Sequence, residues 1–139
     1  MKKRTILWIG ILLLLLLAVA WAYHLYVKPH QSAAGETADF SIDADSLYSQ
    51  YQANEHAADQ KYLGKVIEVS GKLSDIQHSG NTEVWILSQQ GGGGGGINCQ
   101  LFAGVRPDPE PKSGDIVTVK GRCTGFLMDV NLVDCVVSQ

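Results

Sequence analysis

Three of five strand-like stretches after residue 64 alternate apolar and polar side chains, and this alternation limits the possible folds more than any other feature of the 139-residue chain. A period of two is typical of a β-strand with one buried and one solvated face. Turn-forming residues such as Ser113-Gly114-Asp115 separate the stretches. We therefore predict a mainly β domain with strands over residues 67–73, 83–87, 97–102, 117–123 and 129–137.

Five strands in an open sheet would leave unpaired edges, and closure into a barrel removes them. The simplest closed arrangement is the OB-fold, a five-stranded Greek-key barrel. Gly71 lies in the middle of the first predicted strand, where a glycine permits the sharp bend that a barrel strand needs. The sequence therefore predicts an OB-fold barrel.

One amphipathic helix is predicted before the barrel, over Ile42–Tyr62. Asp43 or Asp45 can cap its N-terminus, and Asn54 marks a break into two shorter helices. Its apolar face consists of residues at spacings of three, four and seven, namely Leu47, Tyr48, Tyr51, Ala58 and Tyr62. In this prediction the helix replaces the one that usually joins the third and fourth strands of an OB-fold, where a loop with Pro107, Pro109 and Pro111 stands instead.

The N-terminal segment is almost wholly apolar from Thr5 to Val27 and follows three cations. About 20 apolar residues suffice to cross a bilayer as a helix. We predict an uncleaved transmembrane signal anchor over 1–28, a flexible tether over 29–41 and the OB-fold domain over 42–139. A signal peptide cleaved after Ala18-Val19-Ala20 is the alternative, but the run continues past Ala20 with Trp21 and Tyr23, as an interfacial aromatic belt would. The positive-inside rule then orients the domain toward the periplasm or cell exterior, on the inner membrane.

The charge of the soluble part is acidic. Residues 28–139 carry 8 basic and 14 acidic side chains, a net charge of −6. Nucleic-acid-binding modules usually present a basic surface that neutralises phosphates. This balance argues against general DNA or RNA binding and favours a protein or a small envelope ligand as the partner.

Ligand-binding residues are sought on the face of the second and third strands, which binds oligonucleotides or oligosaccharides in OB-folds. Trp85 and Phe102 point outward there if Val84, Ile86, Cys99 and Leu101 face the core. They would then form a stacking platform, with Lys72, Lys120 and Arg122 as a local basic strip. The alternative is that both aromatics pack beneath the helix and that the cations are ordinary solvated strand residues.

Three cysteines, Cys99, Cys123 and Cys135, are an odd number for an exported domain. An oxidising compartment favours one disulfide, and the spacing leaves its pairing open. All three can equally be buried thiols that pack as small apolar groups.

No enzymatic, metal or cofactor site is expected from the sequence. The pair His56 and Asp59 has no further ligand at a matching spacing, and no nucleophile stands next to a base. Gly91–Gly96 lacks the Lys-Ser/Thr that follows a phosphate-binding loop, and it is interpreted as a flexible hairpin connection between the second and third strands.

Several separate blocks, taken together and in order, resemble the tRNA_anti-like family of OB-fold proteins. They are residues 47–59, 62–71 and 114–125, with Asp129-Val130-Asn131-Leu132 and Asp134-Cys135. The resemblance covers roughly residues 43–137 and implies a short OB domain behind a signal or anchor segment. It supplies no catalytic residues to carry over, and the family name does not establish tRNA binding. We expect a membrane-tethered, non-enzymatic binding module, with a single-stranded nucleic-acid-binding domain as the alternative.

Overall fold

The computed structural model describes residues 3–26, 32–88 and 95–138, and within the first helix it describes the side chains of residues 10–23. The chain divides into two compact units, Met1–His30 and Gln31–Gln139. Each unit is described by itself.

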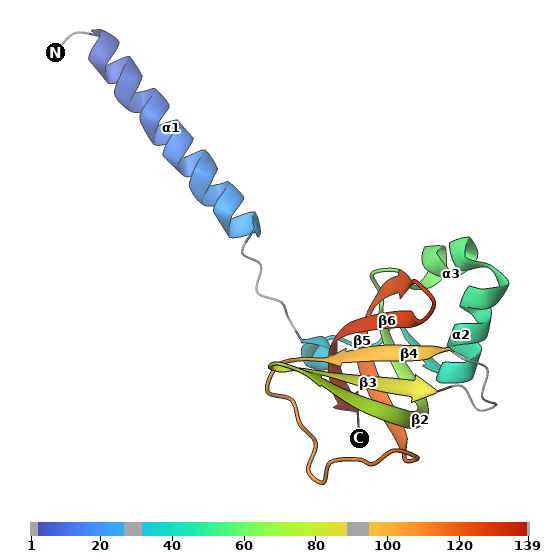
Figure 1. Cartoon of the computed structure of the whole chain (residues 1–139). Helices are drawn as coiled ribbons and strands as arrows, with labels where there is room; N and C mark the ends of the chain where they lie inside the picture. Colours follow the sequence, from blue (N-terminus) through green and yellow to red (C-terminus); the bar gives the residue numbers. More distant parts are fainter. Residues whose placement is uncertain (1–2, 27–31, 89–94, 139) are drawn as a thin grey trace. The chain divides into compact units, whose positions relative to one another are not determined.

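The first unit is the helix α1, Lys3–Tyr26 (Figure 1). Its described apolar side chains are exposed from Ile11 to Tyr23, with Trp21 at 71% and Tyr23 at 68%. A search of the described residues finds no helix with both the length and the apolarity needed to cross a membrane. The predicted transmembrane helix over 1–28 is therefore not confirmed.

The second unit is built on a closed barrel of five strands, which confirms the predicted OB-fold. The strands are β2 (Val66–Ser79), β3 (Thr82–Ser88), β4 (Gly96–Leu101), β5 (Ile116–Phe126) and β6 (Val130–Ser138). They are hydrogen-bonded in the order β2-β3-β4-β6-β5, and β5 returns to β2. All neighbours are antiparallel except β4 and β6, which are parallel.

The predicted helix is present as two, α2 (Ala44–Ala53) and α3 (Glu55–Tyr62), with the break at Asn54. Asp43 Oδ1 accepts a hydrogen bond from the backbone N–H of Ser46 at 2.8 Å. Asn54 Oδ1 accepts in the same way from Ala57 at 3.0 Å. Each side chain thus satisfies a donor that the first helical turn leaves unpaired.

A short strand, β1 (Phe40–Asp43), precedes these helices and was not predicted. It pairs in parallel with β2, Phe40 opposite Ile67 and Asp43 opposite Ser70. The strand with which β1 pairs lies about 27 residues later in the sequence, since Phe40 is opposite Ile67. Sequence periodicity over four residues cannot reveal such a pairing.

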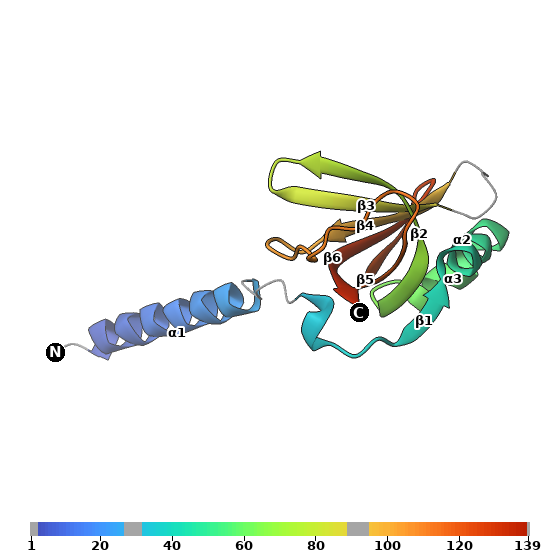
Figure 2. The same ribbon diagram turned by 90° about the horizontal axis from the view of Figure 1, so that it is seen from below.

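The two helices lie at one end of the barrel, and the turn between β2 and β3 lies at the other end (Figure 2). Leu47 and Tyr51 of α2 and Tyr62 of α3 are almost fully buried in the same core cluster as the inner faces of the strands. Between β4 and β5 the described residues 102–115 form a loop without a helix. The predicted exchange of the usual connecting helix for an N-terminal one is therefore confirmed.

Residues 33–41, predicted to be part of a flexible tether, are held on the barrel instead. The 3-10 turn η1 (Ala33–Gly35) places Ala33 in a small second core with Val66 and Val136. The N–H of Asp39 donates to the carbonyl of Val66 at 2.8 Å. The remaining predicted tether residues, 29–31, lie outside the described part of the chain.

Candidate functional site

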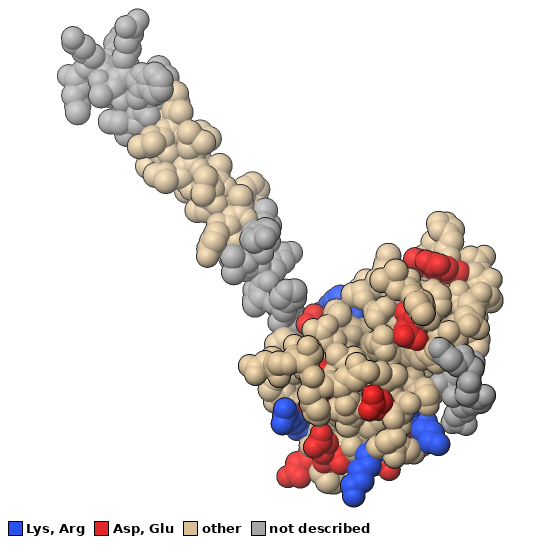
Figure 3. Space-filling view, in the orientation of Figure 1, with Lys and Arg blue, Asp and Glu red and all other residues tan. Residues whose placement is uncertain are grey.

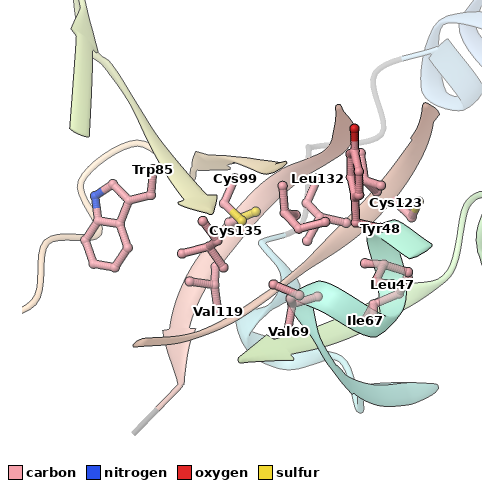
Figure 4. Packing of buried hydrophobic residues seen from close by; sticks show 14 of the residues in the cluster. Leu47, Tyr48, Ile67, Val69, Trp85, Cys99, Val119, Cys123, Leu132 and Cys135 are labelled. Carbon is pink, nitrogen blue, oxygen red and sulfur yellow. The ribbon is translucent and has the colours of Figure 1, made fainter. Parts of the chain in front are cut away.

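Trp85 does not form part of a surface platform. Its side chain has 0% exposure and fills the interior of the barrel (Figure 4). The indole N–H donates to Glu83 Oε1 at 2.6 Å, and Glu83 is itself buried. The outward-facing residues of β3 are Val84 and Ile86, so the predicted orientation of this strand was wrong.

Phe102 is half-buried and packs with Val105 against the second core of Ala33, Val66 and Val136. It belongs to a different cluster from Trp85, which lies in the main core. The two predicted stacking residues are therefore not brought together on one surface.

Lys120 and Arg122 do not form a free basic strip. Lys120 Nζ donates to the carbonyl of Glu36 at 2.9 Å. Arg122 forms an ion pair with the Glu36 carboxylate at 2.6 Å and donates to the carbonyl of Gly64 at 2.9 Å. Both cations fasten the segment after η1 to β5, which accounts for their outward position.

Lys72 is exposed, lies apart from the other two cations and lines a cleft of about 190 Å³. The cleft is open between the start of α2, the middle of β2 and the end of β3; its lining residues are Asp43, Ala44, Asp45, Ser70, Gly71, Lys72 and Ser88. Of the five predicted ligand-binding residues, Lys72 alone has an exposed side chain.

The surface that an OB-fold uses for ligands is formed here by other residues. We name it the outer β3–β4–β6 face, and its members are half-buried or exposed: Val84, Ile86, Asn98, Gln100, Asn131 and Val133. The strand register places Val84 opposite Gln100, Ile86 opposite Asn98, and Asn98 opposite Asn131. The apolar side chains of β3 thus lie beside amide side chains of β4, and Asn98 of β4 lies beside Asn131 of β6.

The carboxylate of Asp129 lies at one end of the outer β3–β4–β6 face and accepts hydrogen bonds there. Asp129 Oδ1 accepts from the N–H of Gly96 at 2.7 Å. The Asn98 amide donates over longer distances, 3.5 Å to Asp129 Oδ2 and 3.4 Å to Asn131 Oδ1. Hydrogen bonds of that length are weak, so these amides keep capacity to bind an incoming ligand.

An exposed apolar turn adjoins this end of the face. The connection from β5 to β6 carries Leu127 and Met128, which are 83% and 84% exposed, and we name this pair the apolar tip. Met128 has a φ of 123°, a value that residues other than glycine rarely adopt. The tip is held by its backbone, because Tyr48 of α2 donates from its hydroxyl to the carbonyl of Met128 at 3.4 Å.

The outer β3–β4–β6 face carries no Lys or Arg among its members. Figure 3 shows mainly uncharged atoms and some acidic groups over these strands, with the basic groups at the margins of the view. A polyanion would find few partners for its phosphates on this surface.

The three cysteines are buried free thiols. Burial raises the pKa of Cys123, whose sulfur lies 3.2 Å from the hydroxyl of Tyr51. No group of three or more His, Cys, Asp or Glu side chains within the described residues is placed to hold a metal ion. The first four residues of Gly91–Gly96 fall outside the described residues, so the interpretation of that segment as a flexible connection is tested only at its end.

Gly95 and Gly96, at that end, are in tight contact with the rest of the domain. A Cβ on Gly95 would overlap the Tyr48 hydroxyl, and one on Gly96 would lie 2.5 Å from the carbonyl oxygen of Leu87. Position 96 therefore requires glycine for steric reasons, because the obstacle is a backbone atom, whereas a side chain at position 95 would displace the Tyr48 ring.

Comparison with known proteins agrees with this fold. The family model described as tRNA_anti-like matches residues 1–137. A crystal structure of a "putative nucleic acid-binding lipoprotein" from Klebsiella pneumoniae is similar with a TM-score of 0.57 and 17% identity, over 70% of this chain and 91% of that one. No protein of curated function matches the sequence.

Two further solved structures share part of the fold. An OBody bound to hen egg-white lysozyme has a TM-score of 0.42 and 18% identity, over 55% of this chain and 84% of its own. The Stn1–Ten1 complex of S. pombe has a TM-score of 0.36 and 16% identity, over 49% and 52% of the two chains. These scores are too low to support an argument.

Proposed function

Because the chain belongs to the tRNA_anti-like family, we propose that its OB-fold domain is a binding module for a protein or a small uncharged envelope ligand. The observation that carries the proposal is the outer β3–β4–β6 face, which combines amides with apolar side chains and has no cation among its members. Each amide offers both a donor and an acceptor, as an uncharged polar partner requires.

The apolar tip favours a protein among these partners. Leu127 and Met128 lie directly before Asp129, so the tip and the amides of the face can meet one ligand together. Protein interfaces are commonly built from a few buried apolar anchors with polar contacts around them. Methionine is well suited to such a surface because its side chain adapts to different partners.

Single-stranded nucleic acid is the second candidate. Its support is the use of OB-folds for this purpose and the description of the similar Klebsiella pneumoniae protein as nucleic acid-binding. The net charge of −6 over residues 28–139 and the engagement of Lys120 and Arg122 with Glu36 stand against it.

We propose a non-enzymatic role at the inner membrane, with the domain on the periplasmic or outer side. The support is the apolar run Thr5–Val27 behind Lys2, Lys3 and Arg4. Membrane fractionation with carbonate extraction tests the attachment, and protease access in intact and permeabilised cells tests the side. Release of the full chain by carbonate would overturn the membrane part of the proposal and leave the binding role standing.

The binding role is tested with a photo-crosslinking residue at Gln100 in the full chain, expressed in its own cells. We expect a discrete adduct from Gln100 and none from Gln60, which is exposed on α3 outside the outer β3–β4–β6 face. Equal labelling from both positions would refute the assignment of the face.

In a second experiment, the purified full chain is titrated with oligothymidylate and with neutral envelope oligosaccharides at two salt concentrations. We expect no salt-dependent binding of oligothymidylate. Binding that weakens steeply with salt would establish the nucleic-acid candidate instead, because release of counterions makes such complexes salt-sensitive.

Met128→Gly separates binding from folding. Glycine tolerates the φ of 123°, so we expect stability to stay level or rise by about 1 kcal/mol while the Gln100 adduct is lost or reduced at least severalfold. Ile116→Ala is the control, since it removes an exposed apolar side chain at the opposite end of β5. Loss of the adduct in the control variant would show that the tip has no special role.

A further inference from the structure

The strand β6 departs from regular alternation, and the departure decides where Cys135 lies. Val130 and Leu132 face the core and Asn131 and Val133 face outward. Asp134 then has a φ of 54°, and the register with both neighbouring strands shifts at this point. One extra residue of this kind reverses the alternation that follows it. Cys135 consequently points inward, with 0% exposure.

In this inward position the Cys135 thiol lies next to the Cys99 thiol of β4, the strand that runs parallel to β6. The sulfurs of Cys99 and Cys135 lie side by side in Figure 4, and the neighbouring Cys99 thiol raises the pKa of Cys135. The register pairs Cys99 with Leu132 and Leu101 with Cys135, so the cysteines occupy neighbouring rungs of adjacent strands.

Gly121 on β5 provides the room for this sulfur. A Cβ on Gly121 would lie 2.4 Å from the sulfur of Cys135, closer than atoms can approach without displacement. A glycine at this position therefore allows the Cys135 side chain to lie next to Cys99.

Cys123 takes no part in this pair. It lies opposite Leu132 on the register of β5 and β6, and its sulfur interacts with the hydroxyl of Tyr51 at 3.2 Å. Figure 4 shows the Cys123 side chain apart from the other two sulfurs, so among the described residues only Cys99 and Cys135 have their sulfurs side by side.

We propose that Cys99 and Cys135 form a disulfide that joins β4 to β6 in an oxidising compartment, while Cys123 remains a thiol. This inference does not depend on the identity of the ligand. Because both thiols are inaccessible in the closed barrel, the bond forms before β6 docks or during a transient opening.

The oxidant is a disulfide of the thiol-oxidoreductase or glutathione class. One cysteine thiolate attacks this disulfide and releases one of its sulfurs as a thiol, which gives a mixed disulfide. The second thiolate then attacks the mixed disulfide and releases the other sulfur. The domain loses two protons and two electrons, and the oxidant gains them as two thiols.

The experiment is a peptide map of the full chain. The chain is refolded from denaturant in oxidised and reduced glutathione, its remaining thiols are alkylated, and it is cleaved before aspartate. Asp108, Asp115, Asp129 and Asp134 separate the three cysteines into different peptides. We expect one linked pair that contains Cys99 and Cys135, and an alkylated Cys123. A link to Cys123, or three alkylated cysteines, would overturn the proposal.

Thermal melting provides the second measurement. A cross-link between positions 99 and 135 restricts the unfolded chain, and we expect the oxidised form to melt at least about 10 °C above the reduced form. Cys123→Ala is expected to keep this difference, and Cys99→Ala or Cys135→Ala to abolish it. If an alanine variant at either paired position does not fold, the peptide map of the parent chain still decides the pairing.

Discussion

A single missing Cβ has a large effect inside a barrel of five strands. Gly121 faces Cys135, Leu132 and the carbonyl of Val133, and a Cβ there would lie 2.4, 3.3 and 3.2 Å from them. Neither a backbone carbonyl nor a close-packed strand can move aside at low cost. Position 121 therefore accommodates a side chain larger than hydrogen only if its neighbours are displaced.

Gly121→Ala should therefore destabilise the domain by about 1–3 kcal/mol, as overpacked core variants do. Chemical denaturation of the full chain measures the effect. Gly35→Ala is the matched control, because nothing lies within 4 Å of the position that its Cβ would take. Cys135→Ala should relieve part of the cost in the double variant, and additive effects would contradict the proposed contact.

The orientation of Trp85 could not be predicted from its neighbours. Residues 84–87 are all apolar, so the strand offers two faces of equal hydrophobicity. Glu83 has the same parity as Trp85, and a charged residue on a strand usually indicates a solvated face. In the structure the acid is buried because it accepts the indole hydrogen bond, a pairing that strand periodicity does not encode.

At the scale of elements, the helices were the most predictable part. The signals at Asp43 and Asn54 act over three residues, and each forms the expected hydrogen bond to a backbone N–H. The alternation of Asn98 and Gln100 with the core residues of β4 was also predicted correctly. β1 was missed because it pairs with a strand far away in the sequence, and the bulge at Asp134 was missed because it depends on the register with both neighbouring strands.

The cap at Asp43 should make α2 sensitive to acid. Hydrogen bonds from the side chain and backbone of Ser46 lower the pKa of Asp43 in the folded domain. A lowered pKa gives stability that is present above the unfolded value of about 4 and is lost as the pH falls through the folded value. Denaturation between pH 2 and about pH 6 measures this trend.

Asp43→Asn and Asp43→Ala separate the charge from the cap. Asparagine still caps a helix, so this variant should lose the part of the acid dependence that comes from residue 43 and keep most of the stability near neutral pH. Alanine should cost about 1 kcal/mol at neutral pH. An unchanged acid profile in Asp43→Asn would show that another carboxyl group causes the dependence.

At the scale of the whole domain, the segment before β1 is fastened rather than free. Its composition of small and polar residues predicted flexibility, since composition reports only local preferences. In the structure, the backbone carbonyl of Glu36 accepts a hydrogen bond from Lys120 of β5, and the Glu36 carboxylate forms an ion pair with Arg122 of the same strand. Two residues predicted for ligand binding thus have a structural role that only the three-dimensional arrangement shows.

Arg122→Gln should loosen this segment without unfolding the barrel. The Glu36–Arg122 pair is about one-third exposed, so we expect a modest effect, about a fivefold faster hydrogen exchange at the amides of Glu36 and Asp39. Lys65→Gln is the control, because it removes the same charge from an exposed position. Equal exchange in the two variants would show that the ion pair does not hold the segment.

The position of β6 has a consequence for biosynthesis. It is the last of the five barrel strands in the sequence, and it pairs with β4 on one side and β5 on the other. During translation the barrel therefore stays open until the final strand emerges, although α2, α3 and four strands are already available. The unpaired edges of β4 and β5 are accessible to other proteins until then, and the docking of β6 covers both.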